Sequence, residues 1–116
     1  MNTIFSALII PSRITEPVRL LPIETGLHNL QDLVRGDIES VTRGDWHVYL
    51  NAEGMIKNLP ANLRAAQLMY DCGLDLAGAA RGLAIFLGND DHGRDQDVPG
   101  HLLRRAEDLF GMQLAA

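Results

Sequence analysis

The stretch at residues 82–88, Gly-Leu-Ala-Ile-Phe-Leu-Gly, most constrains the fold of this 116-residue chain. Its continuous apolar run, closed by glycine at both ends, is typical of a buried β-strand. This is the clearest strand signal in the chain, and it predicts a sheet with this segment in its core.

Two further strands are indicated near the amino terminus. Residues 3–10 are rich in β-forming residues and stop at Pro11. Residues 17–24 are expected to form the second strand. Pro22 indicates that this part of the strand lies at a sheet edge or that the chain leaves the sheet there, because proline has no N–H to donate to the ladder.

A β-hairpin is predicted over residues 38–51. Residues 38–43 and 46–51 each alternate in polarity, and Gly44-Asp45 between them provides a short turn that contains glycine.

The aromatic residues of the hairpin, Trp46 and Tyr49, are expected on opposite faces of the sheet. One ring would then pack in the core and the other would lie on the outer face. Tyr49 is a candidate protein-binding residue, because exposed aromatic side chains anchor interfaces. The alternative is a sheet partly covered by the C-terminal helix.

Three helices are predicted between and after these strands. Thr25 is expected to cap a short helix through Val34, with Gly36 as the left-handed residue after its end. A second helix is expected from Pro60, which suits a first helical turn. Apolar residues on one face predict an amphipathic helix at about residues 100–112.

Together these elements predict an α+β fold. We expect a mostly antiparallel sheet of about five strands, with two or three helices packed mainly on one face. With 47% apolar and 22% charged residues, the composition is that of a folded chain. A length of 116 residues allows one compact domain, and we expect residues 1–116 to form it.

Charge and cysteine content argue against several classes of protein. The formal net charge is −5, and the closest basic pair, Arg104-Arg105, is followed by acidic residues, which argues against a nucleic-acid partner. A single cysteine excludes a disulfide framework and a cysteine-based zinc site. No stretch approaches the roughly 18 apolar residues of a membrane span, and no export signal is visible. The expected location is the cytoplasm.

No segment carries a catalytic or cofactor motif. The chain lacks phosphate-loop, dinucleotide and nucleophile-elbow patterns, and its four histidines lack metal-site spacing. The carboxylates of the loop Asp90–Asp97 could hold a divalent cation, but the loop fails the EF-hand template, and a solvated loop explains it equally. The sequence therefore predicts no catalytic residue, metal ligand or cofactor. It favours a binding protein over an enzyme.

Several motifs resemble those of a known family. They are Tyr49-Leu50-Asn51-Ala52-Glu53-Gly54, Leu59-Pro60-Ala61-Asn62 with Ala65-Ala66, the segment Leu30–Glu39, and Gly78 before the run at 82–88. Over about residues 18–105 the chain is similar to a family of small proteins of phages, plasmids and actinobacterial genomes, known only as a domain of unknown function. The resemblance implies a fold and a phage-associated setting, and it implies no activity.

Asn51, Glu53 and Asn62 stand out within these motifs. One explanation is structural: Asn51 and Glu53 close the second hairpin strand, and Asn62 ties loop backbone in place. The other is that the three side chains converge on a polar pocket. The sequence leaves both explanations open.

The leading functional hypothesis is a small phage-encoded accessory protein that binds a host or phage protein in the host cytoplasm, without catalysis of its own. Nine of the ten basic residues are arginines, which fits a phage of a GC-rich actinobacterial host. The alternative is a domain that binds a small molecule or a metal, or an enzyme, with a polar pocket around Asn51, Glu53 and Asn62. The partner and the oligomeric state stay open.

Overall fold

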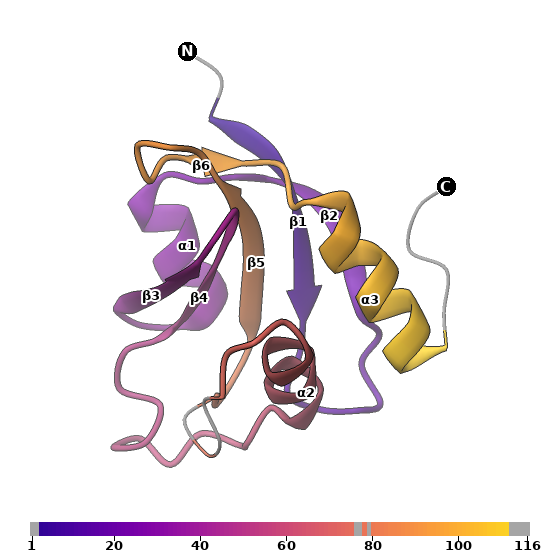
Figure 1. Cartoon of the computed structure of the whole chain (residues 1–116). Coiled ribbons are helices and arrows are strands. Elements are labelled where there is room, and N and C mark those ends of the chain that lie inside the picture. Colours follow the sequence, from indigo (N-terminus) through magenta and orange to yellow (C-terminus); the bar gives the residue numbers. More distant parts are fainter. Residues whose placement is uncertain (1–2, 76–77, 79, 112–116) are drawn as a thin grey trace.

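The computed structural model describes residues 3–75, 78 and 80–111, which form one antiparallel sheet and three helices (Figure 1). The strands are β1 (Ile4–Ile10), β2 (Arg19–Glu24), β3 (Ile38–Arg43), β4 (Trp46–Asn51), β5 (Ala84–Asn89) and β6 (Asp95–Gln96). The helices are α1 (Leu27–Val34), α2 (Leu63–Asp71) and α3 (Gly100–Phe110). Their order in the sheet is β2-β1-β5-β4-β3, and β6 pairs with β5. Within the described part of the chain, no helix is long and apolar enough to cross a membrane.

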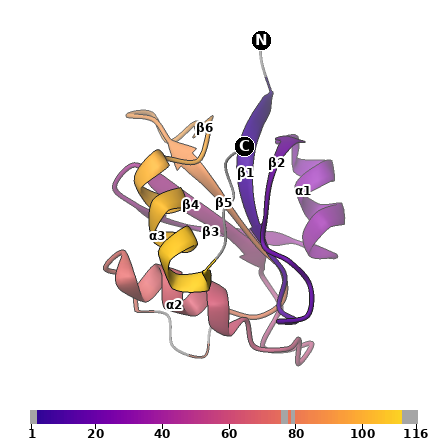
Figure 2. The ribbon, with the colours of Figure 1, turned by 90° about the vertical axis from the view of Figure 1, so that its right-hand side faces the viewer.

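The sheet forms the middle layer of the molecule (Figure 2). Helices α2 and α3 cover one face, where Leu8, Trp46 and Phe86 form the larger core cluster. Helix α1 covers part of the other face and packs on Ile9 and Ile85. The predicted α+β class and antiparallel sheet are confirmed, with two of the three helices on one face.

The run at residues 82–88 supplies the central strand, as predicted. Alternate residues of β5 enter the two core clusters, with Phe86 on the α2/α3 side and Ile85 and Leu87 on the α1 side. All three side chains have no exposed surface. A strand buried on both faces has no polar alternation, which explains why its sequence is continuously apolar.

The ends of α1 differ from the prediction. Its N-cap residue is Gly26, while the Thr25 hydroxyl donates to the Thr3 carbonyl oxygen. The left-handed residue at the other end is Arg35 (φ 62°), one position before the predicted Gly36. Gly36 has a different role, because a Cβ there would come within 2.7 Å of the Asn51 amide nitrogen.

Helix α2 begins three residues later than the predicted start at Pro60. The Pro60 carbonyl oxygen accepts a hydrogen bond from the Gly82 N–H (2.8 Å), and Ala61 forms an isolated bridge with Arg81. These contacts hold residues 60 and 61 in extended backbone. The helix therefore starts only after Asn62.

Candidate functional site

Asn51, the last residue of β4, is 4% exposed, and its side chain binds backbone groups of two segments. Its amide nitrogen donates to the carbonyl oxygens of Val34 (3.0 Å) and Arg35 (3.3 Å) at the end of α1. Its amide oxygen accepts from the Glu53 N–H (2.8 Å). Asn51 thus fixes the end of α1 and the first turn after β4.

Asn62 is 1% exposed and joins three segments. Its amide nitrogen donates to the carbonyl oxygens of Ile10 and Gly82, each at 2.8 Å, and its amide oxygen caps α2 by accepting from the Ala65 N–H (3.0 Å). The predicted tie to loop backbone is confirmed.

Glu53 lies in the same turn as Asn51, where it is half-buried and engaged through its backbone. Its carbonyl oxygen accepts from the Lys57 N–H (2.8 Å). The structure therefore brings Asn51 and Glu53 together. No hydrogen bond among the described residues links either of them to Asn62.

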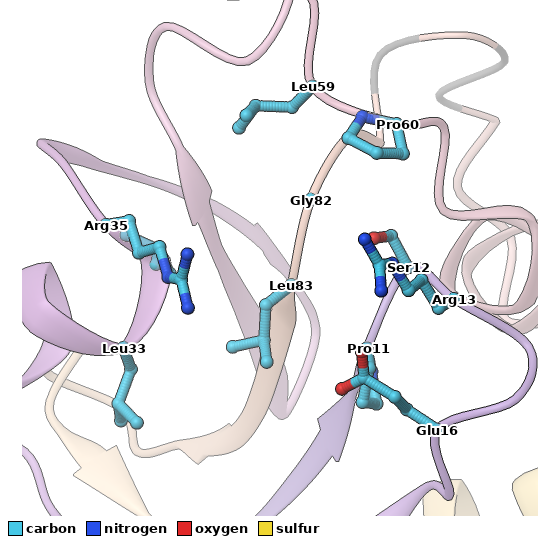
Figure 3. Close-up of a pocket in the computed structure, with 11 residues that line it drawn as sticks. Pro11, Ser12, Arg13, Glu16, Leu33, Arg35, Leu59, Pro60, Gly82 and Leu83 are labelled. Carbon is cyan, nitrogen blue, oxygen red and sulfur yellow. The ribbon is translucent and has the colours of Figure 1, made fainter.

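Between the segments that the two asparagines hold lies a cleft of about 380 Å³ (Figure 3). Asn51 holds one wall through Val34 and Arg35, and Asn62 holds the other through Gly82 and Ile10, the residue before Pro11. Neither asparagine lines the cleft itself. Its apolar lining comes from six residues: Pro11, Leu33, Val34, Leu59, Pro60 and Leu83.

Three charged residues line the cleft: Arg13, Glu16 and Arg35. Figure 3 shows Arg35 extending from one wall, with Arg13 and Glu16 on the opposite wall. Among the described residues, none forms an ion pair or a side-chain hydrogen bond with any of these three side chains. The cleft therefore presents two guanidinium groups and one carboxylate without partners of their own.

Two other arginines at the same end of the sheet have structural partners. Arg64 Nη2 donates to the carbonyl oxygens of Pro11 and Arg13, each at 2.8 Å. Arg81 Nη1 donates to the carbonyl oxygen of Leu59 (3.0 Å). Arg64 and Arg81 thus hold the loops of the cleft in place, whereas Arg13 and Arg35 face its space.

The cleft lies in a larger surface that we call the loop end, defined as residues 11–18, 34–37, 52–64 and 80–83. The strand register places these segments at one end of the sheet, because Ile10 pairs with Ala84, Tyr49 with Ile85 and Ile38 with Asn51. They form the lower end of the molecule in Figure 1.

Large apolar side chains are exposed on the loop end. Ile14 is 76% exposed, Met55 63%, Ile56 83% and Leu63 71%, and they are four of the eight exposed large apolar residues in the described part of the chain. The loop end also holds five of the ten basic residues but three of the fifteen acidic ones. An acidic protein thus has a locally basic and apolar end.

Tyr49 occupies a different site, on the face that α1 partly covers. Trp46 is buried on the opposite face against the Phe86 ring (5.8 Å between centroids), so the predicted split of the two aromatic residues is confirmed. The Tyr49 hydroxyl donates to Asp95 Oδ1 (2.7 Å), and its half-buried ring packs edge-on against His47.

Asp95 is the centre of this buried polar group. Its Oδ1 also accepts from His47 Nε2 (2.7 Å), and His47 is 3% exposed. Burial raises the pKa of the Asp95 carboxyl, but the hydrogen bonds from His47 and Tyr49 outweigh it, so the pKa lies below its ordinary value. Burial and the bond to the Asp95 carboxylate raise the pKa of Tyr49. This network fastens β6 to β4.

The loop Asp90–Asp97 uses part of its carboxylates internally. Asp90 accepts from the backbone of His92 and Arg94 and from the Arg94 guanidinium (2.9 Å), and the Arg94 backbone bond is the main cause of its lowered pKa. No group of three metal-ligating side chains occurs in the part of the chain that the structure describes. Burial raises the pKa of the half-buried Cys72 thiol.

The residues of the cleft carry little sequence signal. Arg13 and Glu16 lie far from Arg35 in the sequence. A sequence pattern reveals charged residues that are contiguous, such as Arg104-Arg105, but not residues that only the fold brings together. The left-handed conformation of Arg35 gave no signal either, because the glycine at position 36 indicated that residue as the left-handed end of the helix.

Comparison with known proteins places the chain in a family. A family model described as "Domain of unknown function (DUF3846)" matches residues 5–111, a wider range than the motifs at 18–105. None of the curated proteins compared with the chain matches it. The crystal structure of small RNA methyltransferase HEN1 is similar to the chain, with a TM-score of 0.55 and 19% identity over 89% of this chain and 16% of that one, which shows a common fold alone. The match over residues 5–111 shows that this chain belongs to the DUF3846 family.

Proposed function

We propose that the protein is a small accessory protein that binds a partner protein through its loop end and performs no chemistry of its own. One observation carries the proposal: unpaired arginines and exposed apolar side chains gather at the same end of the sheet. Arginine and large apolar residues are enriched in protein interfaces, and exposed apolar patches mark such surfaces. The resemblance to phage proteins suggests a host or phage protein in the host cytoplasm as the partner.

The test is affinity capture from the lysate of an actinobacterial host. It compares two variants in which an exposed apolar residue is replaced by aspartate, one at each end of the molecule. Ile56→Asp places a charge on the loop end. Leu27→Asp places it at the start of α1, where Leu27 is 60% exposed. We expect Ile56→Asp to reduce the captured partner at least tenfold and Leu27→Asp to leave it within twofold of the unmodified protein. Equal capture by both variants would contradict the proposal.

Tyr49 provides a second comparison in the same assay. Its hydroxyl bonds to Asp95, so Tyr49→Phe removes that bond and keeps the ring. A partner that binds at the loop end should tolerate Tyr49→Phe. Loss of capture in Tyr49→Phe alone would show that the partner binds instead at the sheet face that α1 partly covers.

A small-molecule binder is the second candidate, because a cleft of about 380 Å³ has the size of ordinary ligand pockets. Thermal-shift measurements against nucleotides and divalent metals address it, and stabilisation by a nucleotide would favour it. RNA is a further ligand to test, because part of a small RNA methyltransferase has a similar fold. Tight RNA binding in a low-salt mobility-shift assay would displace the protein-binding proposal.

A further inference from the structure

We propose that the cleft binds the C-terminal residue of a polypeptide, with its carboxylate between Arg13 and Arg35 and its apolar side chain against the leucine residues that line the same cleft. The inference rests on the proposed function, since the proposed partner would supply this chain end.

The charges of the cleft match one carboxylate. Two guanidinium groups and the Glu16 carboxylate leave a net charge of one positive unit among the side chains that line it. A monovalent anion neutralises this charge, whereas a phosphate group would bring excess negative charge next to Glu16. Glu16 is also available to accept the backbone N–H of the bound residue.

The apolar lining restricts what carries the carboxylate. Leu33, Leu59 and Leu83 share the cleft with the arginines, and in Figure 3 Arg35 lies above Leu33 and extends toward Leu83. A volume of about 380 Å³ accommodates an anion and an apolar group that belong to the same small unit. An apolar C-terminal residue carries both groups on a single Cα atom.

Arg35 is held in an unfavourable backbone conformation. Its φ of 62° lies in the left-handed region, where the backbone of a residue other than glycine is strained. Asn51 stabilises this conformation by donating to the Arg35 carbonyl oxygen (3.3 Å). Strained residues that surrounding contacts enforce occur preferentially at binding sites, and here the strain belongs to an arginine that extends into the cleft.

The opposite wall is also fixed before any ligand arrives. Arg64 donates to the carbonyl oxygens of Pro11 and Arg13, which anchors the backbone that carries the Arg13 side chain. Asn62 fixes the adjoining ends of β1 and β5. A preorganised cleft loses less conformational entropy when a ligand binds.

The test is a titration of the ¹⁵N-labelled full chain, followed by NMR, with N-acetyl-leucine as a model of a chain end. Its amide, N-acetyl-leucinamide, lacks the carboxylate. N-acetyl-aspartate α-amide carries a carboxylate on a side chain without an apolar group. We expect N-acetyl-leucine to shift the Arg35, Gly36 and Leu83 signals and to bind at least fivefold more tightly than either control. Equal binding of the amide, or tighter binding of inorganic phosphate, would overturn the inference.

Two variants complete the experiment. Arg35→Gln removes the charge at nearly constant size and should weaken N-acetyl-leucine binding at least fivefold. Arg104→Gln makes the same change at an exposed residue of α3 and should leave binding unchanged. Circular dichroism checks that both variants are folded. If N-acetyl-leucine does not bind while Ile56→Asp still abolishes capture of the partner, the chain-end inference is wrong and the proposed function stands.

Discussion

At the scale of single residues, Asn62 shows how much of the loop end depends on one side chain. It satisfies the carbonyl oxygens of Ile10 and Gly82 and the N–H of Ala65, and all of these bonds are buried. We predict that Asn62→Ala lowers the free energy of unfolding by about 3 kcal/mol, because it leaves buried polar groups without partners.

Urea denaturation followed by circular dichroism measures this loss. Leu63→Ala is the matched control, since Leu63 is the next residue and is 71% exposed. Its cost should stay within about 0.5 kcal/mol, as for other exposed positions. A similar cost for both variants would mean that Asn62 does not hold the segments together.

Tyr49 gives a prediction of pH dependence. Burial and the Asp95 carboxylate raise its pKa above the value of about 10 that a tyrosine has in the unfolded chain. The contribution to stability is therefore complete below pH 10 and decreases as the pH rises above it, because the unfolded chain ionises first. In a Tyr70→Phe variant, Tyr49 is the single tyrosine, and its absorbance change near 295 nm should appear well above pH 10. A midpoint at pH 10 would contradict the Tyr49–Asp95 bond.

At the scale of elements, patterns of local sequence predicted most of the fold. The alternation of residues 38–51 and the apolar run at 82–88 gave the hairpin and the central strand, because side-chain burial follows strand geometry directly. The predicted cap and left-handed residue of α1 were wrong, and the predicted start of α2 was three residues too early. These helix ends depend on contacts with distant segments, such as Asn51 with Arg35 and Pro60 with Gly82, which local propensity does not contain.

The candidate site was predictable in part for the same reason. Asn51 and Asn62 were recognised from motifs, and the structure shows what they hold. The cleft residues Arg13 and Arg35 were not recognised, since four chain segments must fold before they share a space. No periodicity or spacing in the sequence links them.

The end of α1 gives a prediction at this scale. Arg35 is left-handed, and glycine is the residue that adopts this conformation without steric cost. We predict that Arg35→Gly is more stable than Arg35→Ala by about 1 kcal/mol, because alanine keeps the strained Cβ. Thermal and urea denaturation of the two variants measure the difference. Equal stabilities would show that the αL backbone at Arg35 is not strained, and would remove one support for a binding role.

At the scale of the whole molecule, charge is distributed unevenly along the sheet axis. The loop end carries five basic and three acidic residues, while the rest of the chain carries five basic and twelve acidic residues. An acidic partner surface would therefore be attracted by one end and repelled by the remainder. Such a field orients a partner during its approach and acts mainly on the rate of association.

This asymmetry predicts how the rate of association with the captured partner responds to charge and salt. Arg13→Glu and Arg104→Glu change the net charge equally, but only Arg13 lies at the loop end. We expect Arg13→Glu to slow association at least tenfold in low salt and Arg104→Glu to change it less than threefold. Raising the ionic strength to about 0.5 M should remove most of the difference, because screening then shortens the range of surface charges to a few ångströms. Stopped-flow mixing measures these rates. If both variants slow association equally, net charge rather than its placement controls the encounter, and the loop end loses its role in attracting the partner.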